Sequence, residues 1–218
     1  ARRCGCPVVV APKRADAVRL LEQSGEVDII ITDDGLQHYA LARDIELVVV
    51  DGARRFGNGC LLPMGPLREP MTRLKRVDAI ICNGGTPAQG EYPMALVAAA
   101  PRRVCDDAPL EAPLAGPVDA LAGIGHPPRF FATLTGLGYE LAERVGYADH
   151  QAFDRDELLA RFGARPLLMT EKDAVKCRAF APPHWWYLPV SAELPAALLD
   201  TLLQRLTPLQ APGPEHAH

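Results

Sequence analysis

Two adjacent aspartates that follow an apolar stretch are the first residues whose types could do chemistry. Asp33 and Asp34 come directly after residues 27–32 (VDIIIT), and Gln37 and His38 lie just beyond them. Adjacent carboxylates repel each other, so the pair favours a bound cation or several hydrogen-bond donors. Mg²⁺ is bound by one or two carboxylates where phosphates are handled. The pattern is typical of the metal-binding end of a nucleotide site, and a solvated Asp-Asp-Gly turn is the alternative.

A second group of polar residues combines arginines with glycines and prolines. Residues 51–59 (DGARRFGNG) follow another apolar run and place two arginines among glycines. Guanidinium groups match the geometry of phosphate oxygens, so this loop suits an anionic ligand, and a flexible exposed loop is the alternative. Arg68 and Glu69 stand between two prolines that stiffen the backbone. They are candidates for the same site, with a helix-terminal ion pair as the alternative.

An acidic residue also precedes a histidine late in the chain. Asp149 and His150 form this pair within residues 147–151 (YADHQ). Histidine exchanges protons near neutral pH, and a neighbouring carboxylate tunes its pKa. The pair is therefore a candidate for proton transfer, and a purely structural pair is the alternative.

The elements that must position these residues are strands and helices in alternation. Apolar runs predict strands at 7–11, 27–32, 45–50 and 79–82, and apolar spacing predicts a helix over 14–23. A further helix is predicted over 67–76, interrupted by Pro70. Continuous Val and Ile runs, rather than alternating ones, predict strands that are covered on both faces. Such strands belong to a largely parallel sheet flanked by helices, which is an α/β fold.

The pattern pauses and then restarts in the second half of the chain. Residues 84–117 are rich in Pro and Ala, with one strand-like stretch at 94–100. Strands are predicted at 118–124, 167–169 and 186–190, and helices at 127–137, 154–162 and 195–206, with Asp154 as an N-cap. We therefore predict a first domain over 1–92, a connection over 93–117, a smaller α/β domain over 118–206 and a disordered tail over 207–218.

Composition narrows the class of protein. The net charge of −4 gives no basic bias, so nucleic acid is not the expected partner. Six cysteines are scattered and do not have the spacing of a zinc site. No run reaches the roughly 18 apolar residues that a membrane-spanning helix needs. These features are those of an ordinary globular protein.

Six segments follow one another along most of the chain: DDGLQH at 33–38, RDIELVVVDG at 43–52, FGNGCLLPMGPLREP at 56–70, AGIGHPPRFF at 122–131, DHQAF at 149–153 and LLMTEKDAVKC at 167–177. Taken in this order, they resemble the tetraacyldisaccharide 4′-kinase family, the lipid A 4′-kinases. The resemblance implies transfer of the γ-phosphoryl group of ATP to the 4′-hydroxyl of a tetraacylated glucosamine disaccharide, with ATP and Mg²⁺ as cofactors. It also implies a P-loop-NTPase-like sheet with a second, smaller α/β domain, at the cytoplasmic face of the bacterial inner membrane.

The resemblance also implies a role for each matching residue. It gives a metal-binding role to three acidic residues: Asp33, Asp34 and Glu69. It gives contacts with the substrate to four residues around one cleft: Gln37, His38, Asn58 and Arg68. It gives the catalytic role to Asp149 and His150, with His150 supporting the base that deprotonates the sugar hydroxyl.

The chain departs from the family pattern in its phosphate loop. The sequence contains no G-x-x-x-x-G-K-[ST], the loop that grips the phosphates in P-loop enzymes. In the family, that loop and a membrane-contacting helix precede the first segment matched here. We therefore expect the 218 residues alone to be inactive, and membrane contact to be made by the upstream segment. Smaller departures are Arg55, where a glycine is usual, and His126, where asparagine is frequent.

Two other functions remain compatible with the same residues. A non-catalytic α/β module that binds a nucleotide or sugar phosphate would need the same polar groups at the strand ends. A metal-dependent hydrolase could use Asp33 and Asp34, although no histidine-rich set of metal ligands accompanies them.

Overall fold

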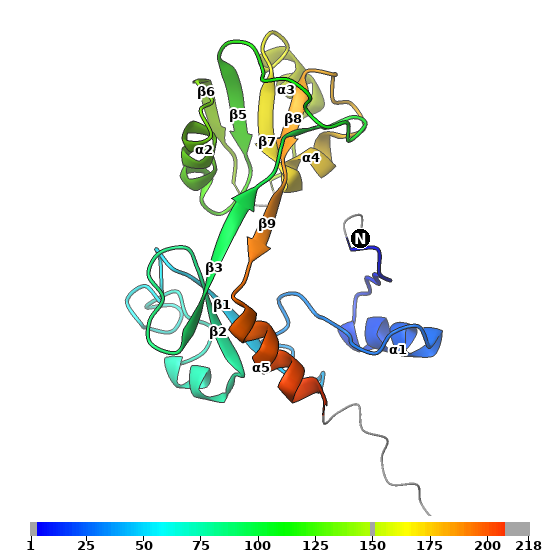
Figure 1. Cartoon of the computed structure of the whole chain (residues 1–218), viewed down its shortest axis with the longest axis vertical. Helices are drawn as coiled ribbons and strands as arrows, with labels where there is room; N and C mark the ends of the chain where they lie inside the picture. Colours follow the sequence, from blue (N-terminus) through cyan, green and yellow to red (C-terminus); the bar gives the residue numbers. More distant parts are fainter. Residues whose placement is uncertain (1–3, 149–150, 208–218) are drawn as a thin grey trace, which may run out of the picture. The chain divides into compact units, whose positions relative to one another are not determined.

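The structure is a computed structural model that describes residues 4–148 and 151–207 (Figure 1). The chain forms two compact units. Unit 1 consists of Ala1–Met94 together with Leu194–His218, and unit 2 consists of Ala95–Glu193. The closing helix, predicted within the second domain, therefore belongs to unit 1. The expected connection at 93–117 instead holds the end of one strand and all of another.

Unit 1 contains a short parallel sheet. Its strands are β1 (Leu47–Asp51), β2 (Ala79–Asn83) and the first part of β3 (Glu91–Ala98). Strand β2 pairs in parallel with both neighbours, and Ile81 lies opposite Val49 on β1 and Tyr92 on β3. The 3-10 helix η1 (Met71–Arg76) leads into β2. The predicted strands at 45–50 and 79–82 are thus confirmed, with small shifts at their ends.

Two helices complete unit 1. Helix α1 (Arg14–Ser24) was predicted, and it ends at Gly25 in the left-handed conformation that suits glycine. Helix α5 (Ala196–Leu206) places the fully buried Leu198 against Ala79 and Ile81 of β2. The apolar stripe of α5 therefore covers one face of the sheet, as the spacing of its leucines predicts.

Two strand predictions in unit 1 are wrong. Residues 7–11 and 27–32 form no strand, and the side chains of Val10 and Ile31 are 92% and 91% exposed. A parallel strand is stable only where neighbouring strands satisfy its backbone groups and helices cover its faces. Within residues 4–148 and 151–207, no strand pairs with either segment. The apolar runs indicate a propensity to form strands, but without neighbouring strands to pair with, that propensity does not produce a sheet.

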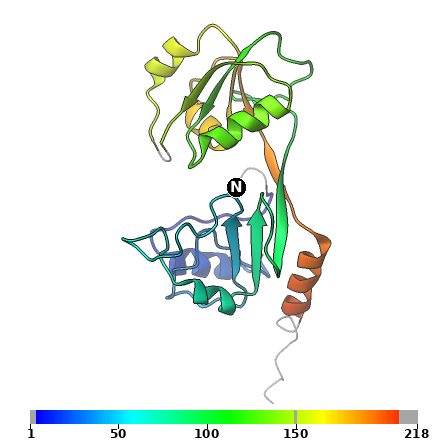
Figure 2. The same cartoon turned by 90° about the vertical axis from the view of Figure 1, so that its left-hand side faces the viewer.

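Unit 2 is a five-stranded α/β layer structure with the strand order β4-β8-β7-β5-β6 (Figure 2). Strands β5 (Val118–Ala122), β6 (Leu141–Gly146), β7 (Leu167–Thr170) and β8 (Trp185–Leu188) are parallel, and β4 (Arg102–Arg103) is antiparallel to β8. The last part of β3 pairs with β9 (Val190–Glu193) in antiparallel fashion. The expected α/β class with largely parallel strands is confirmed.

Helices cover both faces of the sheet in unit 2. Helix α2 (Pro127–Gly136) packs Phe130 and Leu134 on one face, and the other face packs against α3 (Arg155–Arg161) and α4 (Glu171–Cys177). Alternate residues of each strand divide between two cores, so that Trp185 faces the α3 and α4 side. Asp154 caps α3 as predicted, because its Oδ1 accepts a hydrogen bond from the Glu157 amide at 2.8 Å.

No helix of the described residues is long and apolar enough to span a bilayer.

Candidate functional site

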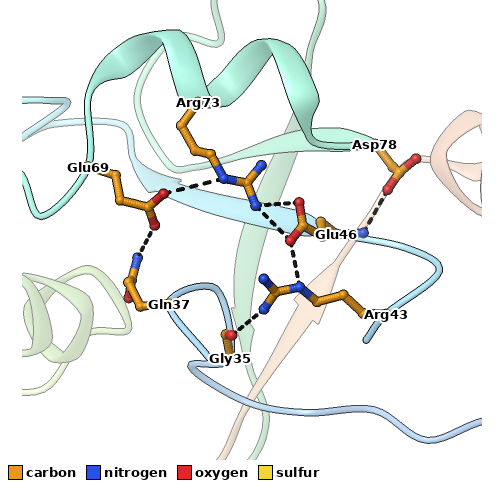
Figure 3. A network of polar contacts seen from close by, with 7 residues as sticks. All are labelled: Gly35, Gln37, Arg43, Glu46, Glu69, Arg73 and Asp78. Atoms are coloured by element: carbon orange, nitrogen blue, oxygen red, sulfur yellow. Dashed lines mark hydrogen bonds and ion pairs between the residues drawn. The ribbon is translucent and has the colours of Figure 1, made fainter. Parts of the chain in front are cut away.

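A chain of ion pairs and hydrogen bonds joins four segments of unit 1 (Figure 3). Gln37 donates a hydrogen bond from its Nε2 to Oε1 of Glu69 at 2.8 Å. Arg73, one turn beyond Glu69, places its Nε 3.3 Å from Oε2 of that carboxylate. The same guanidinium uses Nη2 to contact both oxygens of Glu46, at 2.7 and 2.6 Å. Glu69 and Glu46 are therefore held by one shared arginine.

Arg43 and Asp78 extend this network. Arg43 places its Nε 2.6 Å from Oε1 of Glu46 and donates from Nη1 to the Gly35 carbonyl at 2.5 Å. The backbone amide of Glu46 donates to Oδ2 of Asp78 at 2.7 Å. The network thus fixes the turn at Gly35, which follows Asp33 and Asp34, against the beginning of β1 (Figure 3).

The surroundings of Glu69 keep its carboxyl group ionised. The hydrogen bond from Gln37 is the largest influence that holds the pKa of Glu69 below its usual value, and Tyr39, Arg73 and Arg43 act in the same direction against the opposing effect of burial. The hydrogen bond between Tyr39 and Glu69 raises the pKa of the Tyr39 hydroxyl, because the hydroxyl is the donor and ionised Glu69 is the acceptor. A charged acceptor is thus present beside Gln37 at neutral pH.

Gln37, Arg68 and Glu69 line one pocket of about 260 Å³ in unit 1. Arg73 forms a further part of its polar wall. The rest of the lining is largely apolar and comes from the turn after Asp34, from β1, from the loop before η1 and from η1 itself: Leu36, Val48, Phe56, Pro66, Leu67, Pro70, Met71 and Leu74. Such a pocket can hold an anionic or hydroxylated group near Arg68 and Gln37, with an apolar body against its wall.

The predicted metal residues are not brought together. Among the described residues no three His, Cys, Asp or Glu side chains form a group that could hold a metal ion. Asp33 and Asp34 are exposed, and Asp34 has a left-handed φ of 49° and accepts at its carbonyl from Arg14 Nη1 at 2.7 Å. The carboxylate oxygens of the pair have the right chemistry for Mg²⁺. Each oxygen of Glu69 already has one partner, Nε2 of Gln37 at Oε1 and Nε of Arg73 at Oε2, and its role as a metal ligand remains a prediction.

Asn58 and His38, predicted to bind substrate, lie outside the lining of that pocket. Oδ1 of Asn58 accepts from the Cys60 amide at 3.1 Å, and its Nδ2 donates to the Met64 carbonyl at 2.9 Å. Its side chain therefore closes the following loop. His38 is exposed, and its backbone amide donates to the Gly35 carbonyl at 2.9 Å in the turn after the aspartates.

Arg55 belongs to the loop that was expected to suit an anion. Its guanidinium forms a two-pronged ion pair with Glu91, with N–O distances of 2.8 and 2.5 Å. The backbone of Arg55 is left-handed, with φ 50°, which is the conformation that a glycine adopts without strain. The charge of Arg55, which the sequence analysis expected to bind an anionic ligand, is therefore paired with Glu91. Arg54 of the same loop is exposed.

The catalytic pair Asp149 and His150 lies outside the described residues, and its predicted role remains a prediction. The residues on either side of it are anchored. The Ala148 amide donates to Oε1 of Gln151 at 3.1 Å, and the Gln151 carbonyl accepts from Nζ of Lys176 at 3.3 Å. Lys176 also contacts Oδ1 of the buried Asp173 at 3.1 Å.

Sequence reasoning missed the residues that support Glu69. Arg43, Glu46 and Arg73 were not candidates, although they hold the site together. A signal was present in the spacing, because Arg73 follows Glu69 by four residues and Glu46 follows Arg43 by three, which are ion-pair spacings. The pairing of Arg73 with Glu46, 27 residues away, gives no such local signal.

Comparison with known proteins identifies the family. The family model described as tetraacyldisaccharide-1-P 4′-kinase matches residues 1–207. The chain belongs to this family. Its curated relatives include the tetraacyldisaccharide 4′-kinase of Aeromonas hydrophila, which is 84% identical over 206 residues. That of Tolumonas auensis is 58% identical over 209 residues.

The chain spans less than two thirds of the length of these 4′-kinases. The matches cover 94% of this chain and 62% of the Aeromonas hydrophila relative, and 96% and 64% for Tolumonas auensis. A crystal structure of LpxK from Aquifex aeolicus in complex with ATP matches with a TM-score of 0.58 and 22% identity. That match covers 79% of this chain and 56% of the Aquifex chain, and it shows that the 4′-kinase fold is shared.

Proposed function

We propose that the protein carries out ATP-dependent phosphorylation of the 4′-hydroxyl of a tetraacylated disaccharide 1-phosphate, a step of lipid A biosynthesis. The observation that carries the proposal is the pocket that gathers Gln37, Arg68 and Glu69 from two family segments. The curated relatives are named tetraacyldisaccharide 4′-kinases, which supports phosphorylation at this position. Membership of this enzyme family does not favour the alternative of a non-catalytic binding module.

The residues of the pocket have different roles in binding. Arg68 is exposed at the pocket and offers a guanidinium, which suits a phosphate group of either substrate. Glu69 is held ionised and fixes the amide of Gln37 through its Nε2. The Gln37 Oε1 can then accept a hydrogen bond from a sugar hydroxyl. Arg73 keeps this arrangement in place through its ion pairs with Glu46 and Glu69.

Mg²⁺ and the catalytic pair complete the proposal. Asp33 and Asp34 would hold Mg²⁺, which on binding neutralises charge on the phosphates of ATP. Glu69 would be a third ligand, because each of its oxygens keeps a lone pair beside its contact with Gln37 or Arg73. Asp149 and His150 would assist removal of the proton from the attacking hydroxyl. Support for these roles comes from the family segments that contain them.

The acylated substrate in the relatives' names also supports a location at a membrane. We propose a peripheral position at the cytoplasmic face of the bacterial inner membrane, with contact through a segment upstream of residue 33. The proposal does not depend on any helix of unit 1 or unit 2 entering the bilayer.

The test uses an extended protein, which is this chain joined to the part of the Aeromonas hydrophila relative that it does not cover. The extended protein, with ATP and Mg²⁺, should transfer labelled phosphate to tetraacyldisaccharide 1-phosphate, as thin-layer chromatography would show. Arg68→Gln should reduce kcat/KM by about a hundredfold, because a charge-assisted contact is worth about 3 kcal/mol. The 218-residue chain alone serves as the inactive arm. A folded, ATP-binding extended protein that transfers no phosphate to the disaccharide would refute the proposal.

A further inference from the structure

The loop formed by residues 60–67 (CLLPMGPL) exposes large apolar side chains. Leu62 is 63% exposed and Met64 is 79% exposed, and Leu61 and Met71 are also exposed. Single exposed apolar residues are ordinary on a protein surface. A group of four on one loop and the adjoining 3-10 helix is the kind of patch that marks an interaction site.

The loop holds these side chains in a defined arrangement. The Leu62 amide donates to the Leu67 carbonyl at 2.9 Å, and the Leu67 amide donates to the Cys60 carbonyl at 3.2 Å. Asn58 closes the loop through its hydrogen bonds with the Cys60 amide and the Met64 carbonyl. The exposed apolar side chains therefore belong to a loop whose backbone is held by hydrogen bonds, and not to an unfolded segment.

Met71 lies next to this loop. Met71 lines the same pocket as Pro66 and Leu67 of the loop. A Cβ added at Gly59, the residue before the loop, would lie 3.9 Å from the Met71 Sδ. The apolar residues Leu61, Leu62, Met64 and Met71 therefore belong to one region of unit 1. We call this region the apolar tip.

Basic residues accompany the apolar tip. Residues 53–76 contain six arginines and lysines and a single acidic residue, Glu69, in a chain whose net charge is −4. Glu69 is already paired with Arg73. Three of the basic residues, Arg68, Lys75 and Arg76, are exposed on the loop that follows the tip and on η1. This segment is thus positive in an otherwise acidic protein.

We propose that the apolar tip, with Arg68, Lys75 and Arg76, is a docking surface for an anionic lipid bilayer. Leu62 and Met64 enter the boundary between headgroups and acyl chains, where burial of apolar area favours binding. The basic side chains stay among the headgroups and are attracted by the negative surface. The inference rests on the membrane location proposed above and assigns it a second surface, distinct from the upstream segment. Met71 of this surface lines the pocket that contains Arg68 and Glu69.

Vesicle binding tests this surface without any assay of kinase activity. The extended protein is sedimented with vesicles of phosphatidylglycerol and phosphatidylethanolamine, and with neutral phosphatidylcholine vesicles. Leu62→Ser combined with Met64→Ser should weaken binding to the anionic vesicles by about tenfold or more. Lys75→Gln with Arg76→Gln should weaken it by about fivefold per residue on anionic vesicles only. Binding by the Leu62 and Met64 variant equal to that of the unchanged protein would refute the proposal.

The matched control is Leu203→Ser on α5, because Leu203 is 61% exposed and distant in sequence from the tip. It should leave vesicle binding unchanged, and an equal loss in this control would overturn the assignment to the tip. Circular dichroism melting of each variant separates loss of binding from loss of folding. A failure of the kinase assay with normal vesicle binding would count against the proposed function and not against this surface.

A spectroscopic measurement gives an independent readout. Met64→Trp should show a blue-shifted emission on anionic vesicles and quenching by lipids that carry a nitroxide on the acyl chain. Unchanged emission of this tryptophan on bound vesicles would refute insertion of the tip. Concentration-dependent self-association, abolished by the Leu62 and Met64 substitutions, would instead assign the surface to contact between copies and overturn the proposal.

Discussion

The guanidinium of Arg73 holds the carboxylate of Glu46 with two hydrogen bonds, at 2.6 and 2.7 Å, across 27 residues of sequence. This contact ties the 3-10 helix to the start of β1. Because Arg73 also contacts Glu69, the position of the pocket carboxylate depends on a residue at the beginning of the sheet. The pocket is therefore part of the packing of unit 1 and is not an independent loop feature.

Arg73→Lys should loosen this arrangement even though it keeps the charge. A lysine offers one compact ammonium group and cannot span two carboxylates as a planar guanidinium does. We expect thermal unfolding to occur a few degrees lower, and kcat/KM of the extended protein to fall as Gln37 loses its fixed partner. Arg19→Lys is the matched control, because Arg19 forms an exposed pair with Asp16 on α1, which contributes little. Equal melting shifts for the two variants would contradict the assignment.

Glu69→Gln should destabilise the protein by about 1 kcal/mol at pH 7, because a hydrogen-bonded charge is lost. The Gln37 hydrogen bond in particular holds the pKa of Glu69 below its ordinary value of 4.5. The stabilisation is therefore complete above that value and is lost as pH falls through the lower folded-state pKa. Urea unfolding should show a difference from the unchanged protein that narrows below pH 4.5. The exposed Glu26→Gln is the control, and a difference that persists unchanged at pH 3 would exclude this linkage.

Gly65→Ala should disrupt the loop that carries Leu62 and Met64. An added Cβ would lie 2.2 Å from Oδ1 of Asn58 and 2.3 Å from the Cys60 carbonyl oxygen, so the loop must open. We expect a loss of about 2 kcal/mol in unfolding free energy, typical of overpacking. Gly125→Ala is the control, because nothing lies within 4 Å of a Cβ at that position. If both substitutions cost the same, the close approach at Gly65 is not what matters.

The cysteines should differ sharply in their reactivity. Burial raises the pKa of the Cys177 thiol to about 12, so its thiolate is scarce at pH 8. Cys4 and Cys6 are exposed, and a hydrogen bond with Cys6 lowers the pKa of Cys4. Maleimide labelling followed by mass spectrometry should modify Cys4 within minutes and Cys177 only after denaturation. Rapid labelling of Cys177 in the folded protein would show that the α4 side of unit 2 opens readily.

The metal prediction is tested by Asp33→Asn and Asp34→Asn in the extended protein. Each should raise the Mg²⁺ concentration needed for half-maximal activity by about tenfold, because a neutral amide is a weaker ligand than a carboxylate. Folding should be unaffected, since both side chains are exposed. The exposed Asp28→Asn is the control. An unchanged Mg²⁺ dependence in both variants would remove the pair from the metal site.

Local patterns in the sequence predicted most helices and the buried strands. Helix α1 and helix α3 appear where apolar spacing and the Asp154 cap place them, and β2 and β7 follow their Val, Ile and Leu runs. Residues 27–32 have the same composition and form no strand, because pairing depends on partners elsewhere. Strand β6, which alternates and is largely exposed, carries too weak an apolar signal and was missed.

The sequence predicted which residues belong to the candidate site better than it predicted which atoms their side chains contact. Arg68, Glu69 and Gln37 were chosen from residue types and the family segments, and the structure places all three around one pocket. Asn58 was chosen in the same way, but its amide closes the neighbouring loop. Which polar group faces a ligand and which one satisfies the backbone depends on tertiary packing, which the local sequence does not specify.

The assignment of α5 to unit 1 has a consequence for how the protein is made. Because unit 1 is interrupted by Ala95–Glu193, a ribosome completes all of unit 2 before it delivers the helix that covers Ala79 and Ile81. Until Leu198 arrives, this face of the nascent sheet is open to water and to chaperones that bind apolar segments. Unit 2 is continuous and can fold first. The sheet beside the pocket is therefore covered only after all of unit 2 has been made.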